Sequence, residues 1–98
     1  MTQLASEDTT LLHATRGNPT GLASAIAACL RNHGHAEVDA VGPQCVSTAV
    51  KALAIARAYL KPSSYDLQCA PGFHTIPNRN RPGTELTQII FTVQRVNG

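Results

Sequence analysis

Aromatic side chains are scarce in this 98-residue chain, which has four of them and no tryptophan. Its hydrophobic residues make up 43%, an ordinary fraction for a globular protein, and most of them are alanine, valine, leucine and isoleucine. The length suits one domain. A small domain buries a smaller share of its surface than a large one, so this core supplies modest stability. Burial of a further face against a second copy would add to it, which favours a homodimer.

The chain also lacks segments that direct proteins out of the cytoplasm. Residues 1–9 have neither a basic start nor a continuous apolar run, which argues against a signal peptide, and no later stretch is long enough to span a membrane. Cys29, Cys45 and Cys69 are odd in number and widely spaced, so we expect small buried residues in a reducing compartment rather than disulfides. We predict a cytoplasmic protein, and this location is compatible with association with the nucleoid. Residues 1–9 would form a flexible leader and residues 10–98 a single domain.

Patterns that carry catalysis or hold a cofactor are missing. Only six carboxylates occur, two of them in the leader, which gives poor support for a paired acid/base site. No Walker or Rossmann glycine pattern is present, and no local signature marks a nucleophile beside a base. Cys29, His33 and His35 lie close together, but no second pair completes the four ligands of structural zinc. We predict no catalytic activity, cofactor, metal or small-molecule substrate.

The first half of the chain predicts a strand, a helix and a second strand. The first strand covers about residues 10–15. Asn18 is a favoured helix N-cap, Pro19 suits the first helical position, and Gly34 is a typical stop, so these residues delimit a helix. Alternating polar and apolar residues at 35–40 indicate a half-buried strand.

The second half predicts a helix and two strands. The helix covers about residues 43–61, and Pro62, Ser63 and Ser64 end it. The next strand places one set of side chains on one face: Tyr65, Leu67, Cys69 and Phe73. Residues 74–83 are rich in turn formers and indicate an exposed hairpin loop. The last strand, about 84–96, has a buried side formed by Ile89, Phe91 and Val93.

The order β-α-β-α-β-β predicts the fold class. It indicates an α/β chain of the α+β type, a two-layer sandwich with a mixed four-stranded sheet and two helices on one face.

The second helix has more apolar surface than one sheet face can cover. Such a face needs a stripe of about 100°. The apolar residues fill well over half of the circumference: Val46, Ala49, Val50, Ala52, Leu53, Ile55, Ala56, Tyr59 and Leu60. The polar sector is narrow and holds Ser47, Lys51 and Lys61. The surplus must contact the first helix or a second subunit, and the predicted dimer interface consists of Val50, Leu53, Ala54, Arg57 and Leu60.

Basic residues in the predicted loops indicate a possible ligand, although the formal net charge is only +2. Arg16, Gly17 and Asn18 stand at the start of the first helix, where free backbone N–H groups and the positive end of the helix dipole suit a phosphate. The alternative is that Gly17 and Asn18 only make the turn and cap the helix.

A second group of basic residues lies in the predicted hairpin loop. Arg79 and Arg81 alternate with Asn78 and Asn80, and such an arm could lie in a nucleic-acid groove. The alternative is a solvated, mobile loop whose arginines only aid solubility.

From Leu12 to about Val93 the chain resembles the stage V sporulation protein S family. The resemblance is carried by Pro19 with the alanine-rich first helix, by residues 36–42 (AEVDAVG), and above all by residues 49–57 (AVKALAIAR). That family belongs to the wider Alba-like group of small dimeric proteins, many of which bind DNA or RNA. The resemblance implies the Alba-like fold, a homodimer, and a regulatory role in bacterial sporulation or related development. It also implies sequence-tolerant binding of nucleic acid, and Arg57 matches the family at the edge of the apolar face, where it could pair with a carboxylate across the dimer interface.

The chain departs from the Alba pattern at the start of the second helix. Alba proteins carry basic residues in the turn after their first strand, and Arg16 keeps one of these. They carry arginines at the entrance to the second helix, where this chain has Gly42 and Gln44. Phosphate contacts supply much of the affinity in such proteins, so two hypotheses remain. One is a dimer in which the hairpin arginines compensate for the basic residues missing at positions 42 and 44. This dimer would bind DNA or RNA through Arg16, Gly17, Asn18, Lys51, Arg79 and Arg81. The other is a protein–protein adaptor of the same fold that binds no nucleic acid.

Overall fold

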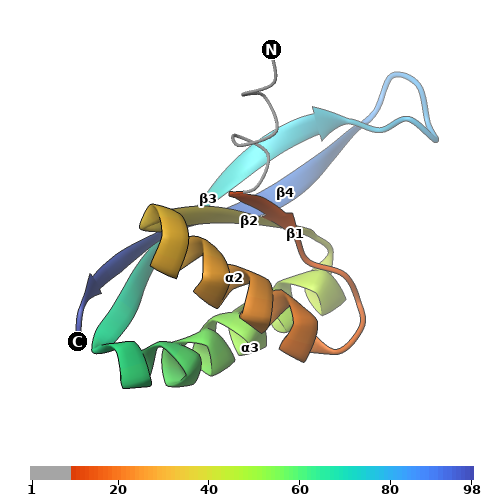
Figure 1. The fold of residues 1–98 in the computed structure, drawn as a ribbon. Coiled ribbons are helices and arrows are strands. Elements are labelled where there is room, and N and C mark those ends of the chain that lie inside the picture. Colours follow the sequence, from red (N-terminus) through yellow and green to blue (C-terminus); the bar gives the residue numbers. More distant parts are fainter. Residues whose placement is uncertain (1–9) are drawn as a thin grey trace, which may run out of the picture.

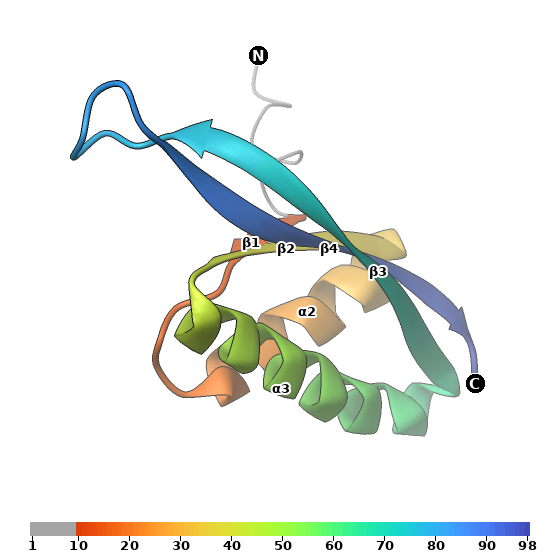
Figure 2. The same cartoon turned by 180° about the vertical axis from the view of Figure 1, so that it is seen from behind.

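The computed structural model describes residues 10–98, and the predicted leader lies outside this range. The elements follow the order expected from the sequence, with one added 3-10 turn: β1 (Leu11–His13), α2 (Pro19–His33), β2 (His35–Val41), α3 (Pro43–Leu60), η1 (Lys61–Ser63), β3 (Tyr65–Pro77) and β4 (Glu85–Asn97). The strands form one sheet in the order β1-β2-β4-β3. β1 is parallel to β2 and the other neighbours are antiparallel, so the sheet is mixed. Both helices lie on one face of it (Figures 1 and 2), which confirms the predicted fold class.

Helix α2 begins and ends at the predicted residues. The Asn18 side-chain oxygen accepts a hydrogen bond from the Thr20 N–H at 2.8 Å, and Pro19 is the first helical residue. Gly34 ends the helix with a φ of 82°, a left-handed conformation that favours glycine, and its N–H donates to the Leu30 carbonyl.

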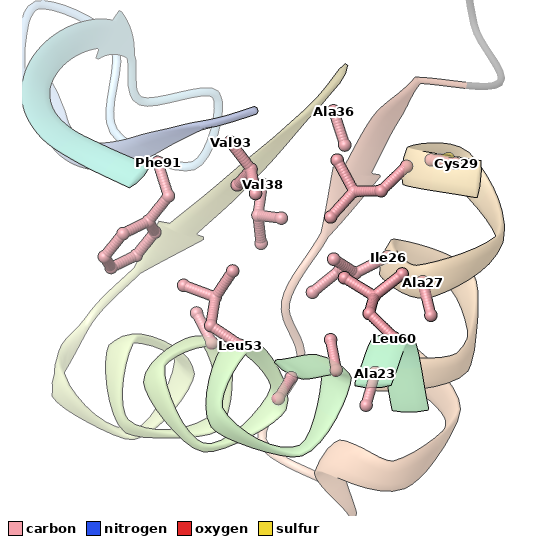
Figure 3. Packing of buried hydrophobic residues seen from close by; sticks show 14 of the residues in the cluster. Ala23, Ile26, Ala27, Cys29, Ala36, Val38, Leu53, Leu60, Phe91 and Val93 are labelled. Carbon is pink, nitrogen blue, oxygen red and sulfur yellow. The ribbon is translucent and has the colours of Figure 1, made fainter. Parts of the chain in front are cut away.

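The core lies between the sheet and the two helices and is built from small aliphatic residues (Figure 3). Its largest fully buried side chains are Ile26, Leu30, Leu60, Val38 and Val93. Phe91 is the one buried aromatic residue among those described. The remaining buried positions are mostly alanines, which let the helices approach each other and the sheet closely: Ala23, Ala27, Ala36, Ala40, Ala49, Ala52 and Ala56. No helix within residues 10–98 has the length and apolar character needed to cross a bilayer.

The β3–β4 hairpin corrects the predicted loop boundary. Residues 74–77 belong to β3 and pair with β4, so the loop comprises only residues 78–84. Thr75 and Ile76 have the β-branched side chains that strands favour, and their cross-strand partners Thr87 and Leu86 continue the ladder. Pro77, one of the residues that suggested a loop, is tolerated here because β3 is an edge strand.

The expectation of three buried cysteines is wrong for Cys69 and only partly met by Cys45. Cys29 is buried, which raises the pKa of its thiol, whereas Cys45 is half-buried and Cys69 is exposed. Burial along the helix-facing side of β3 stops at Leu67, because the strand climbs away from α3 as it approaches the hairpin loop (Figure 2).

Candidate nucleic-acid interface

Arg16 lies between the N-terminal ends of the two helices. It lines a surface pocket of about 290 Å³ together with Gly17, Ser47 and Lys51. It also lines a second pocket of about 240 Å³ with Gly42 and other residues at the start of α3. The tertiary structure therefore brings Arg16, Gly17 and Lys51 together from the β1–α2 loop and from α3. We call Arg16, Gly17, Ser47 and Lys51 the basic cluster.

The N-terminal ends of α2 and α3 lie beside the basic cluster, and no carboxylate in their first turns offsets the positive end of either helix dipole. Neither α2 nor α3 has an acidic residue in its first turn, and the N-cap of α3, Gly42, offers no side-chain acceptor. Asn18 caps α2, as in the alternative given above for this turn. Its side-chain oxygen accepts hydrogen bonds from the N–H and the hydroxyl of Thr20. Asn18 therefore shapes the site through the turn, while the helix dipoles and the two cations supply the attraction for an anion.

Two basic residues of the Alba pattern are missing at the entrance to α3, and the backbone conformation explains the absence of one of them. Gly42 has φ 88° and ψ 158°, a region that is essentially restricted to glycine, so an arginine there would be strained. Gln44 lines both pockets and presents a neutral polar side chain in their walls. Gln44 and Ser47 were not among the residues predicted for the nucleic-acid interface. Their spacing from Lys51, at i−7 and i−4 on one helix, is the signal that could have identified them.

Two of the arginines tie elements of the fold together. Arg31 donates to the Tyr59 carbonyl at 2.8 Å, which ties α2 to α3. Arg95 donates to the carbonyls of Leu30 and Arg31 at the end of α2, and its guanidinium lies 4.5 Å from the centre of the Tyr65 ring. These residues are engaged within the subunit and have fewer donors left for a ligand.

Arg57 pairs within its own subunit rather than across an interface. Its guanidinium binds the Asp66 carboxylate, and this contact holds the pKa of Asp66 at about 2. The position on α3 fits the family pattern, but the carboxylate partner comes from β3 of the same chain.

Five basic side chains in residues 10–98 have no such partner: Lys61 at the end of α3, and the four cations that the sequence places in the predicted interface. Arg16, Lys51, Arg79 and Arg81 are all exposed, and within residues 10–98 none of them makes a hydrogen bond or ion pair through its side chain. Residues 10–98 contain all eight lysines and arginines but only four of the six carboxylates, so the free cations are not balanced locally. Two of those carboxylates, Glu37 and Asp39, lie on the sheet face opposite the helices, and Asp39 binds His13 at 2.7 Å.

Arg79 and Arg81 lie at the tip of the hairpin, apart from the basic cluster. The tip is shaped by its own hydrogen bonds, from the Asn78 N–H to the Thr84 carbonyl at 3.0 Å and from the Arg81 N–H to the Asn78 carbonyl at 3.2 Å. Both views show the hairpin projecting beyond the helices at the end of the molecule where the β1–α2 loop lies (Figures 1 and 2). One subunit therefore presents two separate basic sites at one end.

The predicted dimer interface divides into buried and exposed members. Leu53 and Leu60 are 6% and 0% exposed in the core of the subunit, so they have almost no surface for a second copy. Val50 is 52% exposed, and Ala54 and Arg57 are also exposed. The sequence pattern did not predict that Phe73 is exposed, but 82% of it is accessible.

The arrangement of strands and helices defines the class of protein. A solved structure, Alba from Thermoplasma volcanium, superposes with a TM-score of 0.61 at 17% sequence identity, covering 87% of this chain and 99% of that one. The chain therefore has an Alba-like fold. The family model for Stage V sporulation protein S matches residues 9–96, and the chain belongs to that family. Family and fold together support a sporulation regulator.

Proposed function

We propose that this protein is a homodimer that binds the phosphate backbone of nucleic acid with little preference for sequence. The observation that carries the proposal is the set of four exposed, unpartnered cations, Arg16, Lys51, Arg79 and Arg81, at one end of the subunit. The Alba-like fold and the family resemblance agree with it.

The basic cluster has the chemistry of a phosphate site. Arg16 and Lys51 flank a pocket that also contains the Ser47 hydroxyl, and the start of α2 forms its wall. A helix start with two adjacent cations attracts a phosphate oxygen without reading a base. Contacts of this kind provide affinity and registration on the backbone, so the expected binding depends on salt and tolerates sequence changes.

A second copy is the partner that fits the exposed apolar face on α3 and β3. Val50, Ala54 and Arg57 lie on one stripe of α3, and the bond from Arg57 to Asp66 shows that this stripe turns toward β3. Phe73 lies on the same side of the sheet as Ile89, its direct cross-strand neighbour, which packs against the core. We call Val50, Ala54 and Phe73 the apolar face.

The apolar face has a shape that suits a two-fold contact. Phe73 projects from it, and an apolar hollow of about 250 Å³ lies beside Phe73, lined also by Pro71 and Ile89. A projection and a hollow on one surface can fill each other when two copies meet about a two-fold axis. Pro71 and Pro77 lack the N–H that strand addition requires, so they interrupt sheet extension along the β3 edge and favour association through side chains.

The test is a titration of the full chain against labelled duplex and single-stranded DNA and RNA over a series of salt concentrations. Arg16→Ala with Lys51→Ala should weaken binding and lower the slope of log K against log salt by about 0.9 for each phosphate contact removed from duplex. Lys61→Ala is the matched control, because Lys61 is an exposed cation at the opposite end of α3. Absence of binding to all four nucleic acids at low salt would refute the proposal and favour the adaptor hypothesis.

A further inference from the structure

The β3–β4 hairpin extends beyond the rest of the sheet. β2 pairs with β4 only from Gln88 to Gln94, whereas β3 and β4 continue to pair with each other as far as Pro77 and Glu85. Both views show this ribbon projecting past the helices (Figures 1 and 2). We call residues 75–87 the arginine arm. Among residues 10–98 no third strand pairs with it.

Little within the arm holds its strands rigid. An isolated two-stranded ribbon is only marginally stable in water. Ile76 and Leu86 are direct cross-strand neighbours and form the one pair of large apolar side chains between residues 75 and 87, yet Leu86 is still 36% exposed. The tip is better held, by the Asn78–Thr84 and Arg81–Thr84 backbone hydrogen bonds. The tip can therefore keep its shape while the direction of the arm depends on its root.

The root of the arm combines an exposed aromatic side chain with a neighbouring position that has no side chain. Phe73 is 82% exposed, although it lies opposite Ile89 at the margin of the core. Gly72 precedes it, and a Cβ atom at Gly72 would meet nothing within 4 Å. Gly72 and Phe73 still pair with β4, but the pairing of β4 with β2 ends at Gln88, opposite His74, so the two-stranded ribbon can change direction just beyond this point unless a neighbour holds Phe73.

The second copy proposed above provides that cover. Phe73 borders the apolar hollow and lies on the helix-facing side of β3, the strand toward which the Val50–Ala54–Arg57 stripe turns. A partner subunit that buries Phe73 would fix the strand two residues before the arm on a rigid surface. Each arm would then be held in one direction relative to both basic clusters of the dimer.

Resting on the proposed function, we infer that Phe73 is a positioning residue for the arginine arm. In the dimer the partner subunit buries Phe73 and orders the arm, and in the monomer the arm moves about its root. Arg79 and Arg81 then contribute fully to backbone binding only from the dimer, because a mobile arm must lose more conformational entropy on binding.

Amide hydrogen exchange on the free protein tests this without nucleic acid. The full chain is diluted through the concentration at which sedimentation shows the dimer to dissociate. Exchange at Thr75, Ile76 and residues 85–87 should accelerate by about tenfold or more on dissociation, while core amides in β2 stay protected. Equal protection of the arm in monomer and dimer would overturn the inference. A protein that shows concentration-dependent protection but binds no nucleic acid would refute the proposed function and leave the positioning role standing.

Variants separate positioning from general damage to the dimer. Phe73→Ser and Val50→Ser both remove apolar contact from the apolar face, but only Phe73 lies at the root of the arm. At concentrations where both variants are dimeric by sedimentation, Phe73→Ser should leave the arm amides unprotected and Val50→Ser should not. Phe73→Leu should restore protection, and circular dichroism checks that each variant is folded. Equal arm protection in the Ser variants would contradict the inference.

Discussion

Arg57 on α3 holds the carboxylate of Asp66 on β3 through two parallel hydrogen bonds, from Nε to Oδ1 at 2.7 Å and from Nη2 to Oδ2 at 2.9 Å. The Leu67 N–H adds a third bond to Oδ1 at 2.8 Å. Paired geometry of this kind ties the last turn of α3 to the start of β3 and neutralises both charges beside the apolar face. A paired arginine and carboxylate are easier to bury against a second subunit than either charge alone would be.

The pair predicts how stability depends on pH. The Arg57 hydrogen bond, with the Leu67 N–H, lowers the pKa of Asp66 from 3.8 to about 2. Because the pKa of the folded state is the lower one, the contribution to stability is complete above pH 3.8 and is lost as the pH falls toward 2. Arg57→Gln should return the pKa of Asp66 toward 3.8 in a carbon-detected NMR titration. A titration midpoint unchanged by Arg57→Gln would show that the pair does not set this pKa.

The N-cap of α2 predicts a stability change separable from binding. Asn18→Ala removes the acceptor for the Thr20 N–H and should destabilise the fold by about 1 kcal/mol in urea denaturation. Asn18→Asp keeps an acceptor and adds a negative charge at the positive end of the helix, so it should retain stability but weaken nucleic-acid binding by repelling phosphate. Loss of stability in both variants would mean that the cap does not act through its oxygen.

Substitutions at a buried and at an exposed apolar residue of α3 should have different effects, one on folding and the other on dimerisation. Leu60→Ala empties a fully buried site and should cost about 2–5 kcal/mol of unfolding free energy. Val50→Ala, at a residue that is 52% exposed, should change monomer stability by less than about 0.5 kcal/mol but raise the dimer dissociation constant. Chemical denaturation at protein concentrations below the dissociation constant measures monomer stability. Sedimentation over a concentration range that spans this constant measures dimerisation. A dimer unaffected by Val50→Ala would place the interface elsewhere.

The hairpin arginines predict a change in salt dependence rather than in fold. Arg79→Ala with Arg81→Ala should flatten the dependence of affinity on salt by about 0.9 in slope per lost phosphate contact, because each contact releases counterions. The unfolding midpoint should stay the same, since neither guanidinium makes a hydrogen bond or ion pair within residues 10–98. Asn80→Ala offers a matched change in the same loop without loss of charge. An unchanged slope would remove the hairpin from the proposed interface.

Local sequence signals were sufficient for most of the secondary structure. Asn18-Pro19 and Gly34 mark the bounds of α2 because capping depends on residues next to each other in the chain. The alternation in β2 reproduces its burial, with Ala36, Val38 and Ala40 inside. The same logic misplaced the hairpin boundary, because pairing with β4 outweighed the turn preference of residues 74–77.

Periodicity determined which residues are apolar on α3, but it could not say what covers each of them. Leu60 and Val50 look alike in the pattern, yet Leu60 is fully buried in the core cluster while Val50 is exposed. Helical spacing places side chains around a cylinder, and only the position of the neighbouring elements decides which sectors are filled. The same limit concealed Phe73, whose strand leaves the cover of α3.

For the candidate site, the amino-acid sequence alone determined that Arg16 follows β1, that Lys51 lies on the polar stripe of α3, and that two arginines stand in a hairpin. Only the tertiary structure decided that Arg16 and Lys51 share a pocket and that Arg57 is paired with Asp66. These are contacts between elements, and they depend on how the helices pack on the sheet. Local propensity acts over a few neighbouring residues and carries no information about that packing.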